Sequence, residues 1–340
     1  MFKRFLTATK DTIKEEYKFI FCLILLYIIL QFPLNYYIVV GGGTSDVSSR
    51  INVEDKYKSK GSFNISYVTE LKGTIFTYLL SYVIPTWERE DANNYKYNKK
   101  ESIKDIEFRS DLDLKSANGN AKYWAYSLAN REVNERSSKL YIISVFDGYD
   151  NDLKIQDQIL SMDGNSYGTV EEYKNYLQTK KEKDTVIVKI IRDKKEKEVK
   201  CKLYKYKGRV ILGVGLQFVK EYYTNPEVKI KFKSSESGPS GGLITTLEIY
   251  NQLTKKDLTK GNKIAGTGTI EEDGTIGEIG GVEHKLLGAS KDKADIFLVP
   301  AGDNYKAALK YKKSKKLKIK LIKVKSINDA INKLEALKWE

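Results

Sequence analysis

Histidine and cysteine are almost absent from this sequence. Its 340 residues include one histidine, His284, and two cysteines, Cys22 and Cys201. Typical zinc sites need three or four His or Cys ligands, so such a site is excluded, and two distant cysteines cannot make a disulfide framework. We therefore expect no metal and no cofactor. Any hydrolytic chemistry must use His284, carboxylates, or a lysine that acts as a base.

The composition is that of a globular and strongly basic protein. Charged residues make up 31% of the chain and hydrophobic residues 41%, and the length suits two or three domains. The net charge of +14 fits either a nucleic-acid partner or an anionic membrane surface, and composition does not choose between them.

Ten of the lysines lie between Lys306 and Lys325. Within this stretch Leu317, Ile319 and Leu321 alternate with lysines, as in a strand that has one buried and one wet face. We therefore expect a solvated lysine-rich surface and no nucleic-acid partner.

A largely apolar run of 22 residues, from 19 to 40, carries no charge. At about 1.5 Å per residue, a helix of this length spans a bilayer core of roughly 30 Å. We predict a transmembrane helix over residues 19–40. The alternative is a cleaved signal peptide, whose apolar region is usually about 7 to 15 residues long.

Lysine and arginine are enriched before this run: residues 4–18 hold four, and residues 41–55 hold one. The positive-inside rule then places residues 1–18 in the cytoplasm and the rest of the chain outside it. The predicted localisation is the cell membrane, with a single pass and the lipid bilayer as a partner.

Residues 41–138 are predicted to be a β-rich extracytoplasmic segment. Strand-like runs occur at Phe63–Val68 and Thr74–Val83, and Asp91–Glu107 is polar and resembles an exposed loop. Apolar residues between Leu112 and Val133 recur at helical spacing, which predicts an amphipathic helix.

A compact unit follows at residues 139–205. Its pattern predicts strands at Leu140–Val145, Asp157–Gly164, Thr185–Arg192 and Lys195–Leu203, with a short helix at Val170–Leu177. The run D-x-I-L-x-x-D-G, followed by a helix that begins T-V-E-E, resembles a PDZ domain of the bacterial protease-associated kind. The alternative is a small α/β module with an Asp-Gly hairpin.

The PDZ resemblance implies peptide binding. In such domains an extended peptide joins the edge of the sheet, so that main-chain hydrogen bonds supply affinity and side-chain pockets supply selectivity. By resemblance, the groove would lie beside Leu140, Tyr141, Ile142 and Ile143. The Gly-Leu-Gly-Phe carboxylate loop of the family is not legible in the sequence.

A candidate nucleophile lies in the segment Ser237-Gly238-Pro239-Ser240-Gly241-Gly242, which leads into an apolar-striped helix. Small neighbours leave the Ser240 hydroxyl accessible, and unpaired N–H groups in a first helical turn can stabilise an oxyanion. The alternative is a structural one, because serine is a common helix N-cap and Gly-Pro a common turn.

A candidate base lies in a second helix, which follows Gly280-Gly281. Lys285 sits among Val282, Leu286 and Ala289, an apolar setting that is rare for a lysine in this chain. A lysine acts as a base near pH 7 only when desolvation lowers its pKa. His284 is adjacent, but neighbouring residues on a helix point about 100° apart, so the two do not face one pocket together.

Four ordered motifs, spread over about residues 210–337, resemble the proteolytic domain of Lon proteases. They are S-G-P-S-G-G at 237–242, G-T-G at 266–268, the G-G-V-E-H-K-L-L-G-A run at 280–289, and I-F-L-V-P at 296–300. The resemblance implies that Ser240 is the nucleophile, Lys285 the base, and Thr267 a residue that orients the lysine. It also implies an oxyanion hole in the backbone near Ser240, at Gly238, Pro239 and Gly241, and a homo-oligomer, because such domains assemble as hexameric rings.

Two departures from the Lon pattern matter for function. Many Lon domains carry an acidic residue where this chain has Ser237, and Glu236 is a displaced substitute. No G-x-x-x-x-G-K-[ST] loop occurs in the sequence, so the ATPase module is absent.

The complete prediction is an α+β chain with a transmembrane helix, a β-rich segment, a PDZ-like domain at 139–205 and a Lon-type proteolytic domain at 206–340. This combination resembles the exported PDZ-Lon protease family of Gram-positive and related bacteria. It implies an ATP-independent, membrane-anchored serine endopeptidase that cleaves secreted or cell-surface polypeptides. The alternative, favoured by Ser237, is a catalytically inactive PDZ adaptor at the cell surface.

Overall fold

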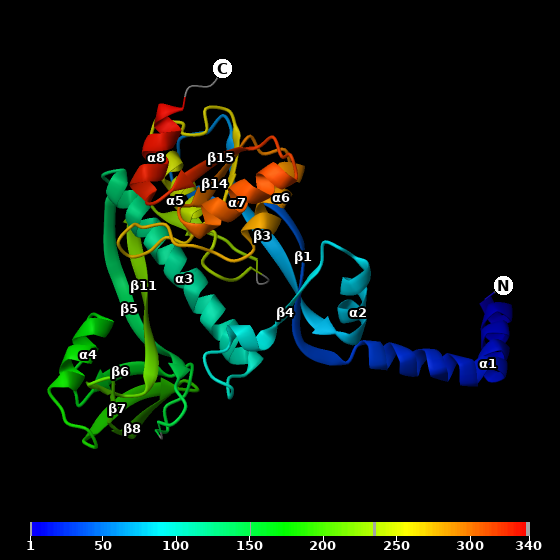
Figure 1. Ribbon diagram of the computed structural model, residues 1–340, viewed down its shortest axis with the longest axis horizontal. Helices are drawn as coiled ribbons and strands as arrows, with labels where there is room; N and C mark the ends of the chain where they lie inside the picture. The colour runs from blue at the N-terminus through cyan, green and yellow to red at the C-terminus, as the bar shows by residue number, and fades with distance from the viewer. Residues whose placement is uncertain (1, 150, 234–235, 338–340) are drawn as a thin grey trace. The chain divides into compact units, whose positions relative to one another are not determined.

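The computed structural model describes residues 2–149, 151–233 and 236–337 (Figure 1). The chain divides into two compact units. One is made of residues 1–41 and 68–95, and the other of residues 42–67 and 96–340. Strands β1 (Pro33–Asp46) and β3 (Ser62–Thr74) contribute residues to both units.

The smaller unit holds α1 (Phe2–Leu30), α2 (Ile75–Val83), β4 (Glu88–Asp91) and the short helix η1 (Ala92–Tyr95). The predicted transmembrane helix over residues 19–40 is wrong. Among the described residues, no helix combines the length and the apolar character needed to cross a bilayer.

The chain leaves the helical conformation halfway through the apolar run. Helix α1 ends at Leu30, and from Pro33 the chain forms β1, whose residues Tyr36–Val39 pair with β4. The helical part of the run, residues 19–30, is therefore about 18 Å long, against a bilayer core of roughly 30 Å. The predicted single-pass membrane localisation depended on this helix and is wrong with it.

The prediction of a strand at Thr74–Val83 is also wrong, because residues 75–83 form α2. Thr74 caps this helix through two reciprocal hydrogen bonds. The Thr77 N–H donates to Thr74 Oγ1 at 3.2 Å, and the Thr74 N–H donates to Thr77 Oγ1 at 2.8 Å. β-branched and aromatic residues suit strands, but this local capping box and tertiary context override that preference.

The larger unit contains an antiparallel sheet in the order β11-β5-β6-β7-β8. Its strands are β5 (Glu132–Val145), β6 (Gln158–Met162), β7 (Thr185–Arg192), β8 (Lys195–Lys202) and β11 (Val214–Asn225). Helix α4 (Val170–Gln178) packs on the sheet through Tyr173 and Leu177, and β9 (Tyr204–Tyr206) pairs with β10 (Arg209–Ile211). The strands and the helix predicted between Leu140 and Leu203 are confirmed.

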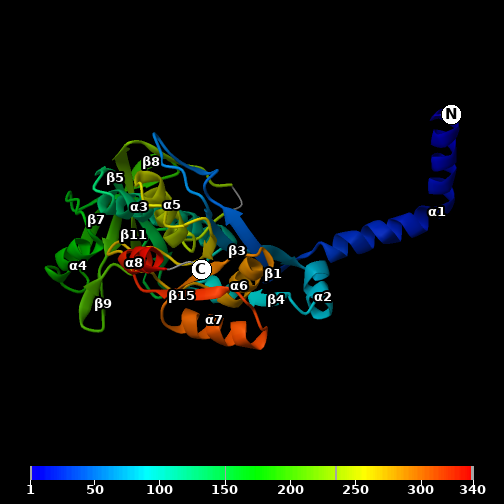
Figure 2. The same cartoon turned by 90° about the horizontal axis from the view of Figure 1, so that it is seen from above.

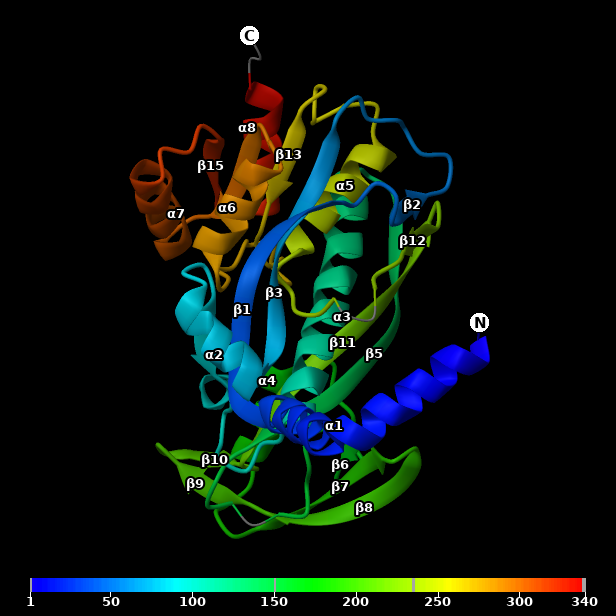
Figure 3. The same ribbon diagram turned by 90° about the vertical axis from the view of Figure 1, so that its right-hand side faces the viewer.

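The larger unit also contains parallel strands in the order β15-β14-β13-β3, with β1 beyond β3. They are β13 (Lys263–Gly266), β14 (Ile296–Pro300) and β15 (Lys320–Val324), together with β3. One apolar core joins this sheet to α5 (Gly242–Leu253) and α8 (Ile327–Ala336), and another joins it to α6 (Val282–Lys291) and α7 (Asp303–Ser314). Figures 2 and 3 show α5 and α6 on opposite sides of the strands.

The lysine-rich stretch is only partly a strand. Residues 303–314 form α7, a helix that the sequence pattern did not predict, and β15 begins only at Lys320, with Leu321 and Ile322 both half-buried. Ile319 is 5% exposed, while Lys318 and Lys320 on either side of it are exposed.

Helix α3 (Ile103–Leu128) packs on α5 and on β5 and β11. It begins earlier than predicted because Ser102 and Asp105 form a capping box. A buried ion pair fixes its first turns: Arg109 Nη2 lies 2.9 Å from Glu101 Oε2, and Arg109 Nη1 donates to the Ile143 carbonyl oxygen at 3.0 Å. A separate antiparallel strand pair in this unit joins β2 (Ile51–Val53) to β12 (Val228–Ile230).

Helix α6 can approach the sheet closely because of one glycine. A Cβ atom added at Gly288 would lie 2.9 Å from the Gly42 carbonyl oxygen. We expect Gly288→Ala to lower the free energy of unfolding by about 1 to 3 kcal/mol, because the clash is with backbone. The matched control is Gly280→Ala, since nothing lies within 4 Å of a Cβ atom there. Chemical denaturation would measure both, and equal effects would contradict the close-approach explanation.

Candidate active site and peptide-binding surface

Ser240 lies at the entry of α5, and glycines shape its surroundings. Gly238 has φ of +79°, in the region that favours glycine. A Cβ atom at Gly241 would lie 2.9 Å from Ile65, and one at Gly242 would lie 2.6 Å from the side chain of Ile270. The S-G-P-S-G-G segment therefore needs its glycines in order to pack between β3 and the chain after β13. The Ser240 side chain itself is half-buried.

The main chain of Ser240 is held by the segment after β13. The Ser240 carbonyl oxygen accepts a hydrogen bond from Gly268 N–H at 2.8 Å and another from Thr267 Oγ1 at 3.2 Å. Leu243 N–H in turn donates to the Gly268 carbonyl oxygen at 3.1 Å. The predicted nucleophile and the predicted lysine-orienting residue are therefore in direct contact, although they are 27 residues apart in the sequence.

Lys285 is buried, with a residue exposure of 4%. It lies on α6, where its neighbours Val282, Leu286 and Ala289 pack into the core between α6 and the sheet. His284 is half-buried on the same helix. The apolar setting expected for Lys285 from the sequence is therefore present.

The three predicted oxyanion positions differ in what they can donate. Gly238 N–H donates to the Ser110 carbonyl oxygen of α3 at 3.1 Å, and Pro239 has no N–H and accepts from Gly242 N–H at 3.0 Å. Among the described residues, no hydrogen bond occupies the N–H of Gly241. Gly241 is thus the only one of the three with a donor to offer.

The acidic residue next to the nucleophile loop is paired with a distant arginine. Glu236, which the sequence offers as a displaced substitute at Ser237, forms an ion pair with Arg50, and its second oxygen accepts from Lys233 N–H at 3.2 Å. Ser237 is exposed. Arg50 comes from a segment nearly two hundred residues earlier, so the sequence carried no signal for this pair.

A buried carboxylate anchors α5 below the nucleophile. Glu248 Oε1 accepts from Gln252 Nε2 at 2.6 Å, and Gln252 Oε1 accepts from Val53 N–H at 2.9 Å. Burial raises the pKa of Glu248, and the hydrogen bond from Gln252 opposes that rise. The helix that begins at the nucleophile is thus tied to β2.

Leu140, Tyr141, Ile142 and Ile143 lie inside the antiparallel sheet. Leu140 pairs with Phe218 of β11 on one side and with Ile159 of β6 on the other. A strand that is paired on both sides has no free edge for an added peptide. These four residues do not border an open groove.

Among the described strands of this sheet, β11 is the last one on that side, and it is long and runs beside β5 (Figure 1). It begins at Val214, between Gly213 and Gly215, a weak signal that sequence reasoning missed. A Cβ atom at Gly215 would lie 2.3 Å from Ser144 Oγ. Phe218 of β11 reaches α4, where its ring centre is 6.4 Å from that of Tyr173.

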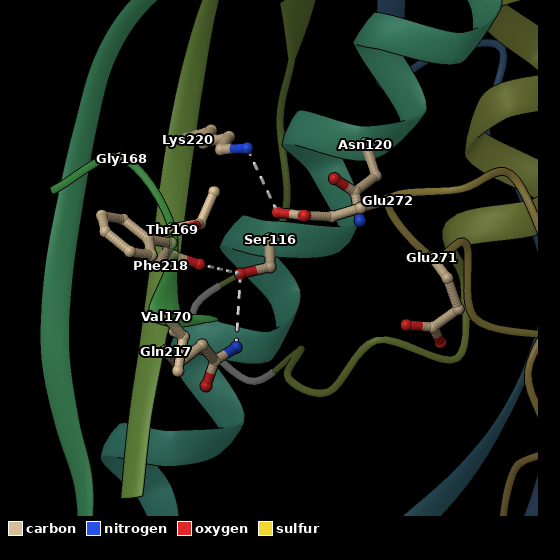
Figure 4. Close-up of a pocket in the computed structure, with 10 residues that line it drawn as sticks. All are labelled: Ser116, Asn120, Gly168, Thr169, Val170, Gln217, Phe218, Lys220, Glu271 and Glu272. Atoms are coloured by element: carbon tan, nitrogen blue, oxygen red, sulfur yellow. Dashed lines mark hydrogen bonds and ion pairs between the residues drawn. The ribbon is translucent and has the colours of Figure 1, made fainter. Parts of the chain in front are cut away.

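A recess of about 300 Å³ opens between β11, the start of α4, and α3 (Figure 4). Gln217 Nε2 donates to Asp113 Oδ1 at 3.0 Å, and Ser116 Oγ donates to the Phe218 carbonyl oxygen at 3.4 Å. Burial raises the pKa of Asp113, opposed by the Gln217 hydrogen bond. The ten residues that line the recess are Ser116, Asn120, Gly168, Thr169, Val170, Gln217, Phe218, Lys220, Glu271 and Glu272.

Comparison with known proteins identifies two domains. A family model of the PDZ domain matches residues 130–203, and one of the Lon protease (S16) C-terminal proteolytic domain matches residues 216–337. A Lon protease of Neorickettsia sennetsu is 28% identical over 117 residues, which cover 34% of this chain and 14% of that protein. The chain thus spans only a small part of this curated relative.

Solved PDZ structures of SdrC-like proteins are also similar. That from Listeria monocytogenes is 30% identical, covers 23% of this chain and 85% of its own, and has a TM-score of 0.22. That from Listeria innocua is 29% identical, covers 23% and 92%, and has the same TM-score. The chain thus combines a PDZ domain with a Lon-type (S16) proteolytic domain, which is the domain combination of the PDZ-Lon proteases.

Proposed function

We propose that this chain is an ATP-independent serine endopeptidase in which Ser240 is the nucleophile and Lys285 is its general base. The observation that carries the proposal is the position of Ser240. Its carbonyl oxygen accepts hydrogen bonds from Thr267 and Gly268, which follow β13. Helix α6, which carries the buried Lys285, packs against the same sheet.

The proposed reaction has two halves. The Ser240 hydroxyl attacks the scissile carbonyl carbon while the neutral Lys285 amine takes its proton, and the Gly241 N–H stabilises the oxyanion. The C–N bond then breaks, the lysine ammonium returns the proton to the leaving amine, and an ester to Ser240 remains. Water, deprotonated by Lys285, hydrolyses this ester to the new carboxyl terminus and free Ser240.

The proposed substrate is an extended polypeptide that is first held by the PDZ domain. Because β5 is paired on both sides, we place the docking surface beside β11 and α4, at the recess in Figure 4. An outer strand of a sheet next to a helix suits the addition of a peptide strand.

Ser240→Ala and Lys285→Met should each lower hydrolysis of a fluorogenic peptide by about 10³-fold or more, since the two groups act as one unit. His284→Gln is the matched control on the same helix, and it should retain activity within about threefold. Thermal melting would verify that all three variants fold. Hydrolysis that survives both of the first two changes would refute the dyad, whereas a folded wild-type chain without hydrolysis would favour the adaptor function.

ATP should not change the rate of peptide or protein cleavage by the 340-residue chain, because its sequence has no phosphate-binding loop. Cleavage of an unfolded protein, with and without magnesium and ATP, is expected to agree within about twofold. A rise of tenfold or more with ATP, lost when a non-hydrolysable analogue replaces it, would contradict this prediction.

Val170→Glu should weaken cleavage of long polypeptides and leave short-peptide cleavage unchanged. Val170 lines the recess as the first residue of α4, where a carboxylate is compatible with the helix dipole and the fold is preserved. We expect KM for an unfolded protein to rise about tenfold, because the glutamate side chain would occupy the recess and place a charge in it. Asn175→Glu, an exposed site on α4 with the same change in charge, is the control. Equal effects of the two variants would rule out this recess as the docking surface.

A further inference from the structure

Ser66 is a fully buried polar residue in the strand beside the candidate active site. Its side chain is 0% exposed, and its Oγ has no hydrogen-bond partner among the described residues. Most buried hydroxyls have a partner, because an unpaired one loses its water without compensation. An unpaired hydroxyl at this position therefore calls for an explanation.

The strand register places Ser66 next to Thr267. Strands β3 and β13 are parallel, and Ile65 is opposite Gly266. Continued by one residue, past the end of β13, this register places Ser66 beside Thr267, which is also 0% exposed. Neighbouring strands lie about 4.8 Å apart, so Ser66, in the first half of β3, is a neighbour of Thr267, which directly follows β13.

Alternation along β3 points Ser66 toward α6. Phe63 and Ile65 pack with the core on the α5 side of the sheet. Residues at the intervening positions face the other side, where Ala265 of β13 packs with Leu286 of α6. Ser66 therefore faces the helix that carries the proposed base.

The height of Lys285 along the sheet matches that of Ser66. Helix α6 connects two parallel strands and so runs opposite to them, and its end is marked by Asp292, whose carbonyl oxygen accepts from Lys263 Nζ at 2.7 Å. Lys285 precedes Asp292 by seven residues, or about 10 Å of helix. Thr267 and Ser66 lie four residues beyond the start of β13, or about 13 Å of strand. The difference between these two distances, about 10 Å along the helix and about 13 Å along the strand, is shorter than a lysine side chain.

We propose that Ser66 is a positioning residue for Lys285. A neutral amine has two N–H donors and one lone pair. If the Ser66 and Thr267 oxygens accept the two N–H groups, the lone pair is left to point at the Ser240 hydroxyl. The Thr267 hydroxyl proton is already donated to the Ser240 carbonyl oxygen, so its oxygen is available as an acceptor. This inference rests on the proposed Ser240 and Lys285 pair and adds a second acceptor to it.

The test compares Ser66→Ala, Ser66→Cys and Ser66→Thr in the full chain. Two readouts are used: kcat and KM for a short fluorogenic peptide, and the rate at which a fluorophosphonate probe labels Ser240. Alanine has no acceptor and a thiol is a weak one, so both variants should lower kcat and the labelling rate about 10- to 100-fold, with KM within about twofold. Threonine keeps the hydroxyl and should restore both rates to within about threefold of wild type.

Ser62→Ala is the matched control, because it removes a hydroxyl four residues earlier on the same face of β3, where Ser62 Oγ accepts from Asn64 Nδ2 at 2.8 Å. It should leave both rates unchanged, and melting temperatures would report folding for every variant. Wild-type rates in folded Ser66→Ala or Ser66→Cys, alongside an inactive Ser240→Ala, would overturn the role of Ser66 alone. Hydrolysis that persists in both Ser240→Ala and Lys285→Met would overturn the proposed function, and this inference with it.

Discussion

The parallel pairing of β3 with β13 is the constraint on which the candidate active site depends. It joins residues 62–65 to residues 263–266 across nearly two hundred residues of chain. The pairing brings Ile65 under Gly241 and sets the level at which Thr267 meets the Ser240 carbonyl oxygen. Without β3, the loop before α5 would lose the surface on which its glycines pack. The proteolytic site therefore includes a strand that lies well before the residues matched by the Lon family model.

Close packing around these paired strands creates the apolar surroundings in which Lys285 is buried. Gly242 lies against Ile270 and Gly288 against the backbone of Gly42, so both α5 and α6 approach the strands more closely than larger residues would allow. A buried lysine needs such a setting, because water near its amine would stabilise the charged form. The same apolar packing makes every polar group near the lysine significant, because a buried polar group is costly unless it is hydrogen-bonded.

Local patterns predicted the elements that depend on neighbouring residues in the sequence. The strands and helix of the PDZ domain and the helix after Ser240 were found because alternation and helical spacing are local properties. Residues 19–40 and Thr74–Val83 were misjudged for a different reason. Strand pairing of β1 with β4 shortened the apolar helix, and a Thr74 cap turned a strand-like run into α2. Neither the partner strand nor the balance of cap against propensity can be read from hydrophobicity alone. The link between Glu236 and Arg50 was out of reach for the same reason.

The peptide-binding surface illustrates how much one additional strand changes. The residues Leu140–Ile143 have the right sequence for a strand beside a groove, but β11 pairs with them and becomes the outer strand. β11 also leads directly from the PDZ sheet toward β12 and the nucleophile loop, and α3 packs on both β11 and α5. A polypeptide bound along β11 would therefore contact elements that are continuous with the proteolytic domain. The outer strand of the PDZ sheet is thus a covalent and a packing link between the PDZ domain and the Lon-type domain.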